Sequence, residues 1–167
     1  MYQRLIDLLD GHQARYRLID HVAEGRTDLA SVLRGHPLDQ AAKCIVVRVS
    51  ITKRVGKYVL AVVPGDRQVD LEAVGALFGG GRTAFATPEI AERLAGSVCG
   101  TVMPLSFHPD LHLVVDEGLI LTEEIYFNAA RLDRSVALST PDYLAIAQPQ
   151  LAAIATAGAR VLTHSAR

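Results

Sequence analysis

Two spacings of hydrophobic residues recur along the chain. Apolar residues at every third or fourth position predict an amphipathic helix over residues 2–10 that ends near Gly11. Residues 44–51 and 58–63 are short apolar runs rich in valine, which is typical of buried strands. Because only a short turn separates these runs, we expect them to pair as antiparallel strands, with Lys43 at the mouth of the first.

The same two patterns continue through the rest of the chain. Further strands are expected at residues 16–21, 83–86, 111–116, 124–127 and 135–138, and further helices at 27–34, 70–78, 88–96 and 139–146. Thr27 and Thr87 are the predicted N-caps of their helices, and Pro88 suits a first helical position. No repeat or linker divides the 167 residues, a length that provides one hydrophobic core. We therefore expect a single domain that mixes helices and strands.

The charge balance argues against a large nucleic-acid interface. Charged residues make up 21% of the chain and the net charge is −1, whereas binding to many phosphates needs an excess of Lys and Arg. A small contact with one nucleic-acid end stays open, and its affinity should be modest and depend little on salt. Tryptophan is absent and aromatic residues are few, so no stacking platform for single strands is evident.

The sequence shows no targeting or membrane signal. Its first residues lack the apolar block of a signal peptide, and no run reaches the roughly 18 apolar residues of a membrane span. Cys44 and Cys99 lie far apart with no pairing pattern, which is typical of reduced thiols. We expect a cytoplasmic protein with no membrane partner.

Two features could carry chemistry. Lys43 stands where a rigid strand leaves the core, although a lysine in such a place is most often simply solvated. In the stretch from Gly100 to Pro104, the glycine lets a ligand approach the main chain and the proline fixes the other end. Such a loop can present amide N–H groups to a carbonyl oxygen. The alternative is an ordinary turn between a helix and a strand.

Two more polar residues are candidates with open alternatives. Asn128 follows a strand and could bind a ligand hydroxyl, or it could satisfy turn backbone. The small residues Ala129 and Ala130 beside it allow close approach. His21 ends a strand and could be an acid, a base or a packed histidine.

Metal and nucleotide sites are not favoured. Among His108, His112 and Cys99 only one pair has ligand-like spacing, and Pro109 lies inside it. The three glycines at 79–81 follow a helix, whereas a phosphate loop follows a strand and opens a helix. We therefore expect no metal and no cofactor.

An ordered set of motifs carries a resemblance to a known family. The motifs are Ala41-Ala42-Lys43, the loop from Gly100 to Pro104, Phe127-Asn128-Ala129-Ala130-Arg131 and Ser135-Val136-Ala137-Leu138. Over residues 1–150 this set resembles the YbaK/ProX family of aminoacyl-tRNA editing domains, also called the prolyl-tRNA synthetase insertion-domain-like family. The stretches 34–35, 106–109 and 142–149 resemble its free-standing YeaK-like branch, which is associated with clearing mischarged seryl- and threonyl-tRNAs.

The resemblance implies a fold, a reaction and a set of site residues. It implies an α+β fold with a bent, mixed and largely antiparallel sheet over residues 1–150, followed by a tail or helix at 151–167. The family's essential lysine corresponds to Lys43 and its GxxxP loop to Gly100, Thr101, Val102, Met103 and Pro104. Its polar pocket positions correspond to Asn128 and Ser135, a histidine of many members to His21, and a frequent glycine to Ala130.

These residues suggest a mechanism of ester hydrolysis on the aminoacylated 3′ end of tRNA. Amides around Gly100 and Thr101 would polarise the carbonyl, and Lys43 would stabilise developing charge. Water would attack with help from the substrate's own ribose hydroxyl. A serine or threonine substrate would suit Asn128, Ser135 and Thr101.

Other functions are compatible with the same residues. One is the same chemistry on alanyl- or cysteinyl-tRNA(Pro), and another is a non-catalytic module that binds a tRNA end or a synthetase. A synthetase or an elongation factor is a further candidate partner that would select the tRNA.

Overall fold

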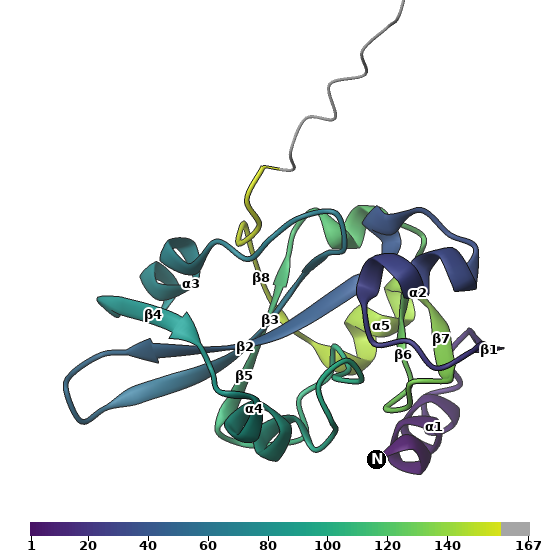
Figure 1. Cartoon of the computed structure of the whole chain (residues 1–167), viewed down its shortest axis with the longest axis horizontal. Helices are drawn as coiled ribbons and strands as arrows, with labels where there is room; N and C mark the ends of the chain where they lie inside the picture. Colours follow the sequence, from purple (N-terminus) through teal and green to yellow (C-terminus); the bar gives the residue numbers. More distant parts are fainter. Residues whose placement is uncertain (158–167) are drawn as a thin grey trace, which may run out of the picture.

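The computed structural model describes residues 1–157, which form one α+β domain (Figure 1). The helices are α1 (Tyr2–Gly11), α2 (Thr27–Arg34), α3 (Leu71–Leu77), α4 (Pro88–Ala95) and α5 (Thr140–Ala147), with short 3₁₀ turns at Leu38–Gln40 and Leu119–Leu121. The strands are β1 (Tyr16–Asp20), β2 (Ala42–Ser50), β3 (Gly56–Pro64), β4 (Arg82–Phe85), β5 (Leu111–Asp116), β6 (Glu124–Asn128), β7 (Arg134–Ser139) and β8 (Gln150–Ala152). No helix among residues 1–157 is both long and apolar enough to cross a membrane.

The strands form two sheets that meet beside the start of β2. The larger has the order β4-β2-β3-β5-β8, in which β2 pairs antiparallel with β3 and β4, whereas β5 is parallel to β3 and β8. The smaller, β1-β7-β6, is antiparallel throughout. A bridge between Ala41 and Tyr126 joins them. This confirms the expected mixed, largely antiparallel α+β fold and the β2–β3 pairing, with the sheet divided in two.

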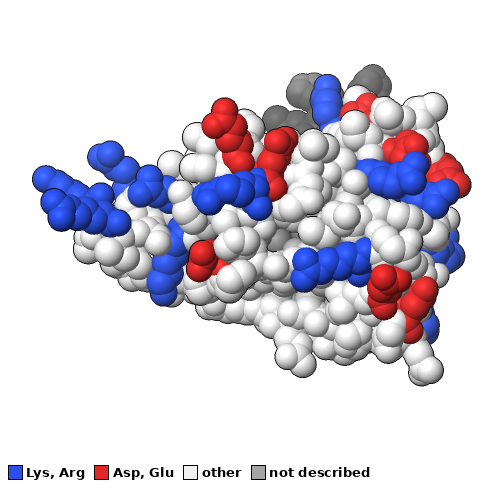
Figure 2. All heavy atoms as spheres, turned by 90° about the horizontal axis from the view of Figure 1, so that it is seen from below, with Lys and Arg blue, Asp and Glu red and all other residues white. Residues whose placement is uncertain are grey.

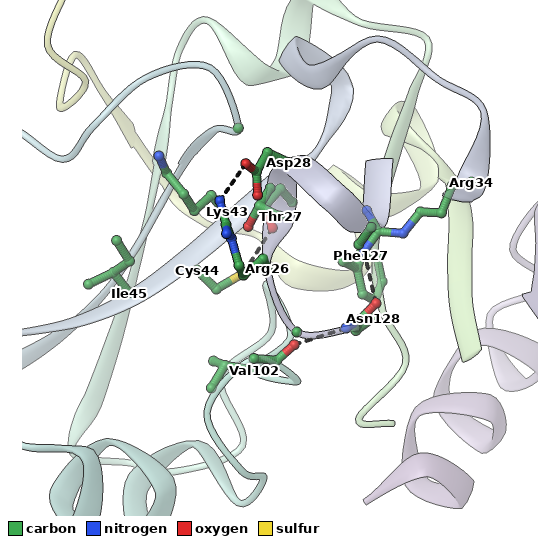
Figure 3. A pocket seen from close by; sticks show the side chains of 15 residues that line it. Arg26, Thr27, Asp28, Arg34, Lys43, Cys44, Ile45, Val102, Phe127 and Asn128 are labelled. Atoms are coloured by element: carbon green, nitrogen blue, oxygen red, sulfur yellow. Dashed lines mark hydrogen bonds and ion pairs between the residues drawn. The ribbon is translucent and has the colours of Figure 1, made fainter. Parts of the chain in front are cut away.

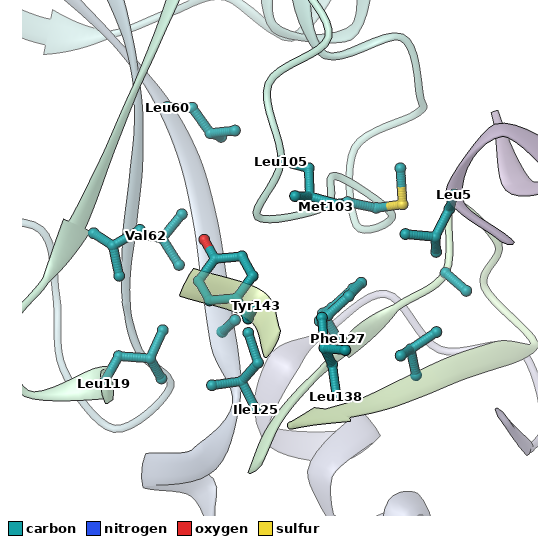
Figure 4. Packing of buried hydrophobic residues seen from close by; sticks show 14 of the residues in the cluster. Leu5, Leu60, Val62, Met103, Leu105, Leu119, Ile125, Phe127, Leu138 and Tyr143 are labelled. Carbon is teal, nitrogen blue, oxygen red and sulfur yellow. The ribbon is translucent and has the colours of Figure 1, made fainter. Parts of the chain in front are cut away.

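Alternating side chains of β2 separate two hydrophobic clusters. Val46 faces the larger cluster, to which α1, α4 and α5 contribute buried residues. Figure 4 shows Phe127 and Tyr143 among the large side chains of this cluster. Val47 and Val49 face the smaller cluster, which α3 covers on the other side of the larger sheet. Because the side-chain period of a strand is two, this alternation fixes which β2 residues share a face.

The helix ends follow local capping chemistry. The Thr87 hydroxyl accepts a hydrogen bond from the Ile90 N–H at 3.4 Å, and Pro88 is the first residue of α4, as predicted. The prediction for Thr27 is wrong: Arg26 precedes α2, and Thr27 is its first helical residue with no capping bond. Its side chain is thereby left available for another role.

The chain after α5 belongs to the fold as far as residue 156. Strand β8 pairs with β5, and Ile154 is fully buried. The buried Asp116 carboxylate accepts hydrogen bonds at 2.9 Å from the N–H groups of Gly118, Ile154 and Ala155. The predicted tail therefore begins as part of the larger sheet, and its residues 158–167 lie outside the described residues.

We predict that Asp116→Ala will lower the free energy of unfolding by about 3 kcal/mol, because charge-assisted hydrogen bonds to a buried carboxylate are lost. Asp116→Asn is the matched control, since its amide oxygen still accepts from Ile154 and Ala155. Urea denaturation measures both. Equal stability of the alanine variant and the wild type would contradict this role.

Candidate active site

A pocket of about 520 Å³ lies where the two sheets meet (Figure 3). It is bounded by α2 and the residues before it, the start of β2, the loop from Gly100 and the end of β6. Its lining comprises Gly25, Arg26, Thr27, Asp28, Ala30, Arg34, Ala42, Lys43, Cys44, Ile45, Gly65, Gly100, Val102, Phe127 and Asn128. Of the ten residues predicted for the site, Lys43, Gly100, Val102 and Asn128 are in this lining.

Helix α2 lines the pocket with one face. Thr27, Ala30 and Arg34 are spaced three and four residues apart, so they lie on the same side of the helix and all line the pocket. Arg26, just before the helix, pairs with Asp28 at 2.9 Å. This ion pair compensates both charges, so the uncompensated charges in the lining are cationic, on Arg34 and Lys43.

Lys43 lies at the entrance of the pocket, as expected from its place at the start of β2. It is half-buried, and its ammonium donates a hydrogen bond to the Arg67 carbonyl. Burial lowers the pKa of Lys43 from its ordinary value, while the nearby Asp66 acts in the opposite direction. The result is a positive charge that is partly stripped of water but tethered by a neutral acceptor.

The loop from Gly100 to Pro104 is fixed at both ends. The Asn128 amide donates to the Gly100 carbonyl at 2.9 Å, and the Tyr143 hydroxyl donates to the Pro104 carbonyl at 2.6 Å. Gly100 has φ +87°, and a Cβ there would lie 3.0 Å from the Gly25 Cα. Only glycine fits this combination of left-handed backbone and close approach.

Part of this loop is free to donate hydrogen bonds. Within residues 1–157 the structure shows no acceptor for the N–H groups of Gly100 and Val102, both of which line the pocket. The expectation for Thr101 needs correction: its N–H and its hydroxyl both donate to the Val98 carbonyl, at 3.0 and 2.7 Å. Thr101 therefore shapes the turn and has no donor left for a ligand.

Met103 and Pro104 are also corrected. Both are buried, and Met103 is part of the larger hydrophobic cluster together with the following Leu105. Neither lines the pocket. The apolar half of the loop thus anchors it to the core, and Val102 alone among the three predicted apolar loop residues faces the pocket.

The Asn128 side chain uses every hydrogen bond it can make. Its oxygen accepts from the Arg34 guanidinium and the Ser135 hydroxyl at 2.9 Å, and its NH₂ group donates to the carbonyls of Glu24 and Gly100 at 2.9 Å. An amide offers two acceptor and two donor positions, so none is left for a substrate hydroxyl. Of the two alternatives for Asn128, satisfaction of backbone is therefore the one observed.

Ser135 and His21 stand behind Asn128, outside the pocket lining. The fully buried Ser135 hydroxyl accepts from Arg34 Nε at 2.8 Å, donates to Asn128 and lies 2.7 Å from His21 Nε2. His21 Nδ1 lies 2.8 Å from the Val22 carbonyl. The prediction that Ser135 and His21 contact substrate is corrected, because their polar atoms belong to an internal network.

Arg34 is the functional candidate that the sequence reasoning missed. Its guanidinium contacts only neutral groups, and no carboxylate pairs with it within residues 1–157. Burial lowers the pKa of Arg34 to about 10, so the group is still charged at neutral pH. The usable signal was the 27–30–34 spacing, which places Arg34 on the same helix face as the start of α2.

Ala130 does not line the pocket but occupies a special backbone position. Its φ is +57°, the left-handed region, and it follows Asn128 in a tight turn closed by a 3.0 Å bond from its N–H to the Asn128 carbonyl. The family's frequent glycine at this position now has a physical reason. The backbone requirement of the turn remains even where alanine occupies it.

The two histidines considered as metal ligands, His108 and His112, each contact a different neighbour. The His112 ring lies 5.5 Å from the Phe78 ring at an angle of 55°, and His108 accepts a hydrogen bond from the Asp110 N–H. Within the described part of the chain, no three His, Cys, Asp or Glu side chains gather in a way that could hold a metal ion.

The chain belongs to the family of aminoacyl-tRNA editing domains, whose family model matches residues 25–146. The matched region contains α2, Lys43, the Gly100 loop and Asn128. Two curated relatives, from Escherichia coli K12 and from Escherichia coli O157:H7, are each 44% identical to this chain over 151 residues, which is 90% of this chain and 90% of theirs. Each is named multifunctional Ser/Thr-tRNA deacylase ProXp-y.

Solved structures share the fold. A crystal structure described as a putative trans-editing enzyme for prolyl-tRNA synthetase superimposes with a TM-score of 0.76 at 22% identity, covering 93% of this chain and 97% of the other. A hypothetical protein superimposes with a TM-score of 0.81 at 19% identity, covering 92% and 99%. At these identities the likeness concerns the fold alone.

We predict that Gly100→Ala destabilises the protein more than Gly79→Ala does. Both glycines have positive φ, +87° and +62°, so both alanines cost about 1–2 kcal/mol of backbone strain. A Cβ at Gly79 meets nothing within 4 Å, whereas one at Gly100 meets the Gly25 backbone. The difference between the thermal stabilities of the two variants measures the effect of the close approach between Gly100 and Gly25. Equal losses of stability would show that this contact is unimportant.

Proposed function

We propose that this chain is a free-standing aminoacyl-tRNA deacylase that hydrolyses seryl- and threonyl-tRNAs. The observation that carries the proposal is that one pocket is lined by Lys43 and by Gly100 and Val102, whose N–H groups have no acceptor within residues 1–157. The family membership and the name of the 44% identical relatives support the reaction and the amino acids.

The reaction needs a held carbonyl and stabilised negative charge. As water adds to the ester, the carbonyl oxygen becomes an oxyanion that the N–H groups of Gly100 and Val102 can bind. One such donor is typically worth about 2.7–4 kcal/mol of barrier. Asn128 and Tyr143 hold the loop from outside, so its donors are arranged before the substrate arrives.

The cations of the pocket suit the phosphates of a tRNA end. Lys43 at the entrance acts as a point charge for the terminal phosphate or the oxyanion. Arg34 lies deeper and is fixed by Asn128 and Ser135, so it supplies a second, immobile positive charge. The two charges favour an anionic substrate because no carboxylate of the described residues pairs with Arg34 or Lys43.

The proton of the attacking water goes to the substrate rather than to a protein base. Asp28 is the carboxylate in the lining, and it is engaged by Arg26 at 2.9 Å. Burial raises the pKa of the Cys44 thiol, which keeps it protonated and unsuited as a nucleophile. A ribose hydroxyl next to the ester is then the nearest group that can relay the proton.

Thr27, rather than Asn128 or Ser135, recognises the side-chain hydroxyl of a serine or threonine substrate. Thr27 lines the pocket, and within residues 1–157 its hydroxyl has no hydrogen-bond partner. Phe127 and Val102 add apolar walls. A pocket that binds a substrate hydroxyl discriminates far better than one that measures size alone.

Two further assignments are part of this proposal. The location is cytoplasmic, where charged tRNAs are used, and the partner is the aminoacylated 3′ end. Hydrolysis of alanyl- or cysteinyl-tRNA(Pro), binding without turnover, and a synthetase or elongation factor that delivers the tRNA are the alternatives that the experiments below separate.

We predict that Lys43→Ala lowers kcat/KM for deacylation by about 10²–10³, as expected when one charge-stabilising group is removed. The assay follows loss of Ser, Thr, Ala, Cys and Pro from purified charged tRNAs. Lys57→Ala is the matched control, because this exposed lysine lies on β3 away from the pocket. Tight tRNA binding without turnover on the whole panel would instead identify a binding module.

We predict that Thr27→Val and Asn128→Ala have different selectivities. Thr27→Val keeps the shape and removes one hydrogen bond, so it should lower kcat/KM on seryl-tRNA about tenfold and leave residual activity on alanyl-tRNA unchanged. Asn128→Ala releases the Gly100 loop, so it should lower activity on both tRNAs by the same factor. If Asn128→Ala lost activity on seryl-tRNA alone, the result would contradict this prediction and would instead support a direct contact between Asn128 and the substrate.

A further inference from the structure

The β2–β3 hairpin projects from the body of the domain and carries only positive charge. No Asp or Glu occurs between Lys43 and Pro64, and the connection between the strands contains Lys53 and Arg54. Arg82 of β4 pairs with Ser50 beside this connection. Seen from the side that carries α4, the narrow end of the molecule shows Lys and Arg without any Asp or Glu (Figure 2).

These cations are not used within the domain. Within residues 1–157 no ion pair includes Arg48, Lys53, Arg54 or Arg82, and all four are exposed. Elsewhere, five arginines pair with carboxylates within 3.0 Å, namely Arg15, Arg17, Arg26, Arg131 and Arg134, whereas the exposed Arg4, Arg67 and Arg93 are in no ion pair of residues 1–157. The hairpin and the neighbouring β4 differ from the rest of the surface in that their unpaired cations are clustered, with no Asp or Glu between Lys43 and Pro64, which the net charge of −1 does not reveal.

Two of the cations share a face of the sheet with the pocket. Arg48 is four residues from Cys44 on β2, so their side chains point to the same side. The β2–β4 register places Arg82 next to Ser50 on that same side. Lys57 pairs with Val49 and lies on the opposite side, where its ammonium is 5.6 Å from the Phe78 ring.

A second hollow adjoins the pocket and extends to the end of β4. It has about 210 Å³ and shares Cys44, Ile45, Gly100 and Val102 with the first pocket. Its outer wall includes Phe85, which is 59% exposed at the end of β4. An exposed aromatic ring beside an apolar hollow is a place where an unpaired base can stack.

We propose that Arg48, Arg82, Lys53 and Arg54 bind the phosphates of the tRNA acceptor stem, while the single-stranded 3′ end passes Phe85 to the pocket. This inference rests on the proposed function for the identity of the RNA. Ser50 is seven positions beyond Lys43 along β2, a distance of about 23 Å at roughly 3.3 Å per residue. With the aminoacylated nucleotide in the pocket, the tip of the hairpin therefore lies too far away to contact that nucleotide. It is within reach of the double-stranded acceptor stem, which begins after the unpaired 3′ nucleotides.

The proposal revises the expected salt dependence. An interface that neutralises several phosphates releases counterions, so its affinity falls steeply as salt rises, by about 0.9 in log–log slope for each phosphate contact. Arg48→Gln combined with Arg82→Gln tests this. Arg15→Gln combined with Arg131→Gln is the charge-matched control, because it removes two arginines that already pair with carboxylates.

The first measurement is binding of uncharged full-length tRNA across a salt series. We expect Arg48→Gln/Arg82→Gln to weaken binding at least tenfold at low salt and to reduce the slope by about 2. The control should stay within about twofold of wild type. If the affinity of Arg48→Gln/Arg82→Gln for tRNA and its salt dependence were unchanged, the proposal would be overturned. The hairpin would then be a candidate surface for an acidic protein partner instead.

The second measurement compares deacylation of full-length tRNA with that of an aminoacylated terminal trinucleotide, which is too short to reach the hairpin. We expect the Arg48→Gln/Arg82→Gln variant to lose activity on the full-length substrate only. Equal losses on both substrates would point to a distorted pocket and count against the proposal. If wild type hydrolyses neither substrate while tRNA binding still depends on the hairpin, the proposed function fails and the docking surface stands.

Discussion

The Asn128 side chain is the junction on which the pocket depends. Its amide joins the segment before α2, the Gly100 loop, the Arg34 guanidinium and Ser135, and it is 5% exposed. A buried polar group is costly unless all its hydrogen bonds are made, so the amide specifies one arrangement of these four partners. The same contact fixes the Gly100 carbonyl, and with it the start of the loop that lines the pocket.

The periodic features of the fold could be predicted from sequence, and the direction of individual side chains could not. The spacing of apolar residues identified α1, the paired β2 and β3, and the Thr87-Pro88 start of α4, because these depend on local geometry. Lys43 and Gly100 were predicted for a similar reason: a strand end and a glycine–proline loop are visible in a few residues. Both are in the pocket lining.

The errors concern residues whose partners are distant in sequence. Arg34 meets Ser135 across 101 residues, and Asn128 meets Glu24 across 104. No local pattern tells whether such a polar side chain faces a ligand or another side chain. Thr101 failed differently: its hydroxyl found a backbone acceptor three residues away, a competition that small polar side chains enter readily in turns. The composition likewise concealed the charged hairpin, since net charge averages over position.

The placement of β8 has a consequence for how the chain is completed during synthesis. Asp116 leaves the ribosome with β5, but two of its three N–H partners, Ile154 and Ala155, are translated almost forty residues later. Until then only the Gly118 N–H of these three partners is present, and the edge of β5 that faces β8 stays unpaired. The segment from α2 to β6, which lines the pocket, is therefore synthesised before β8 pairs with the edge of the larger sheet. The contacts of β8, Ile154 and Ala155 thus make the stability of β5 depend on a segment that is synthesised well after it.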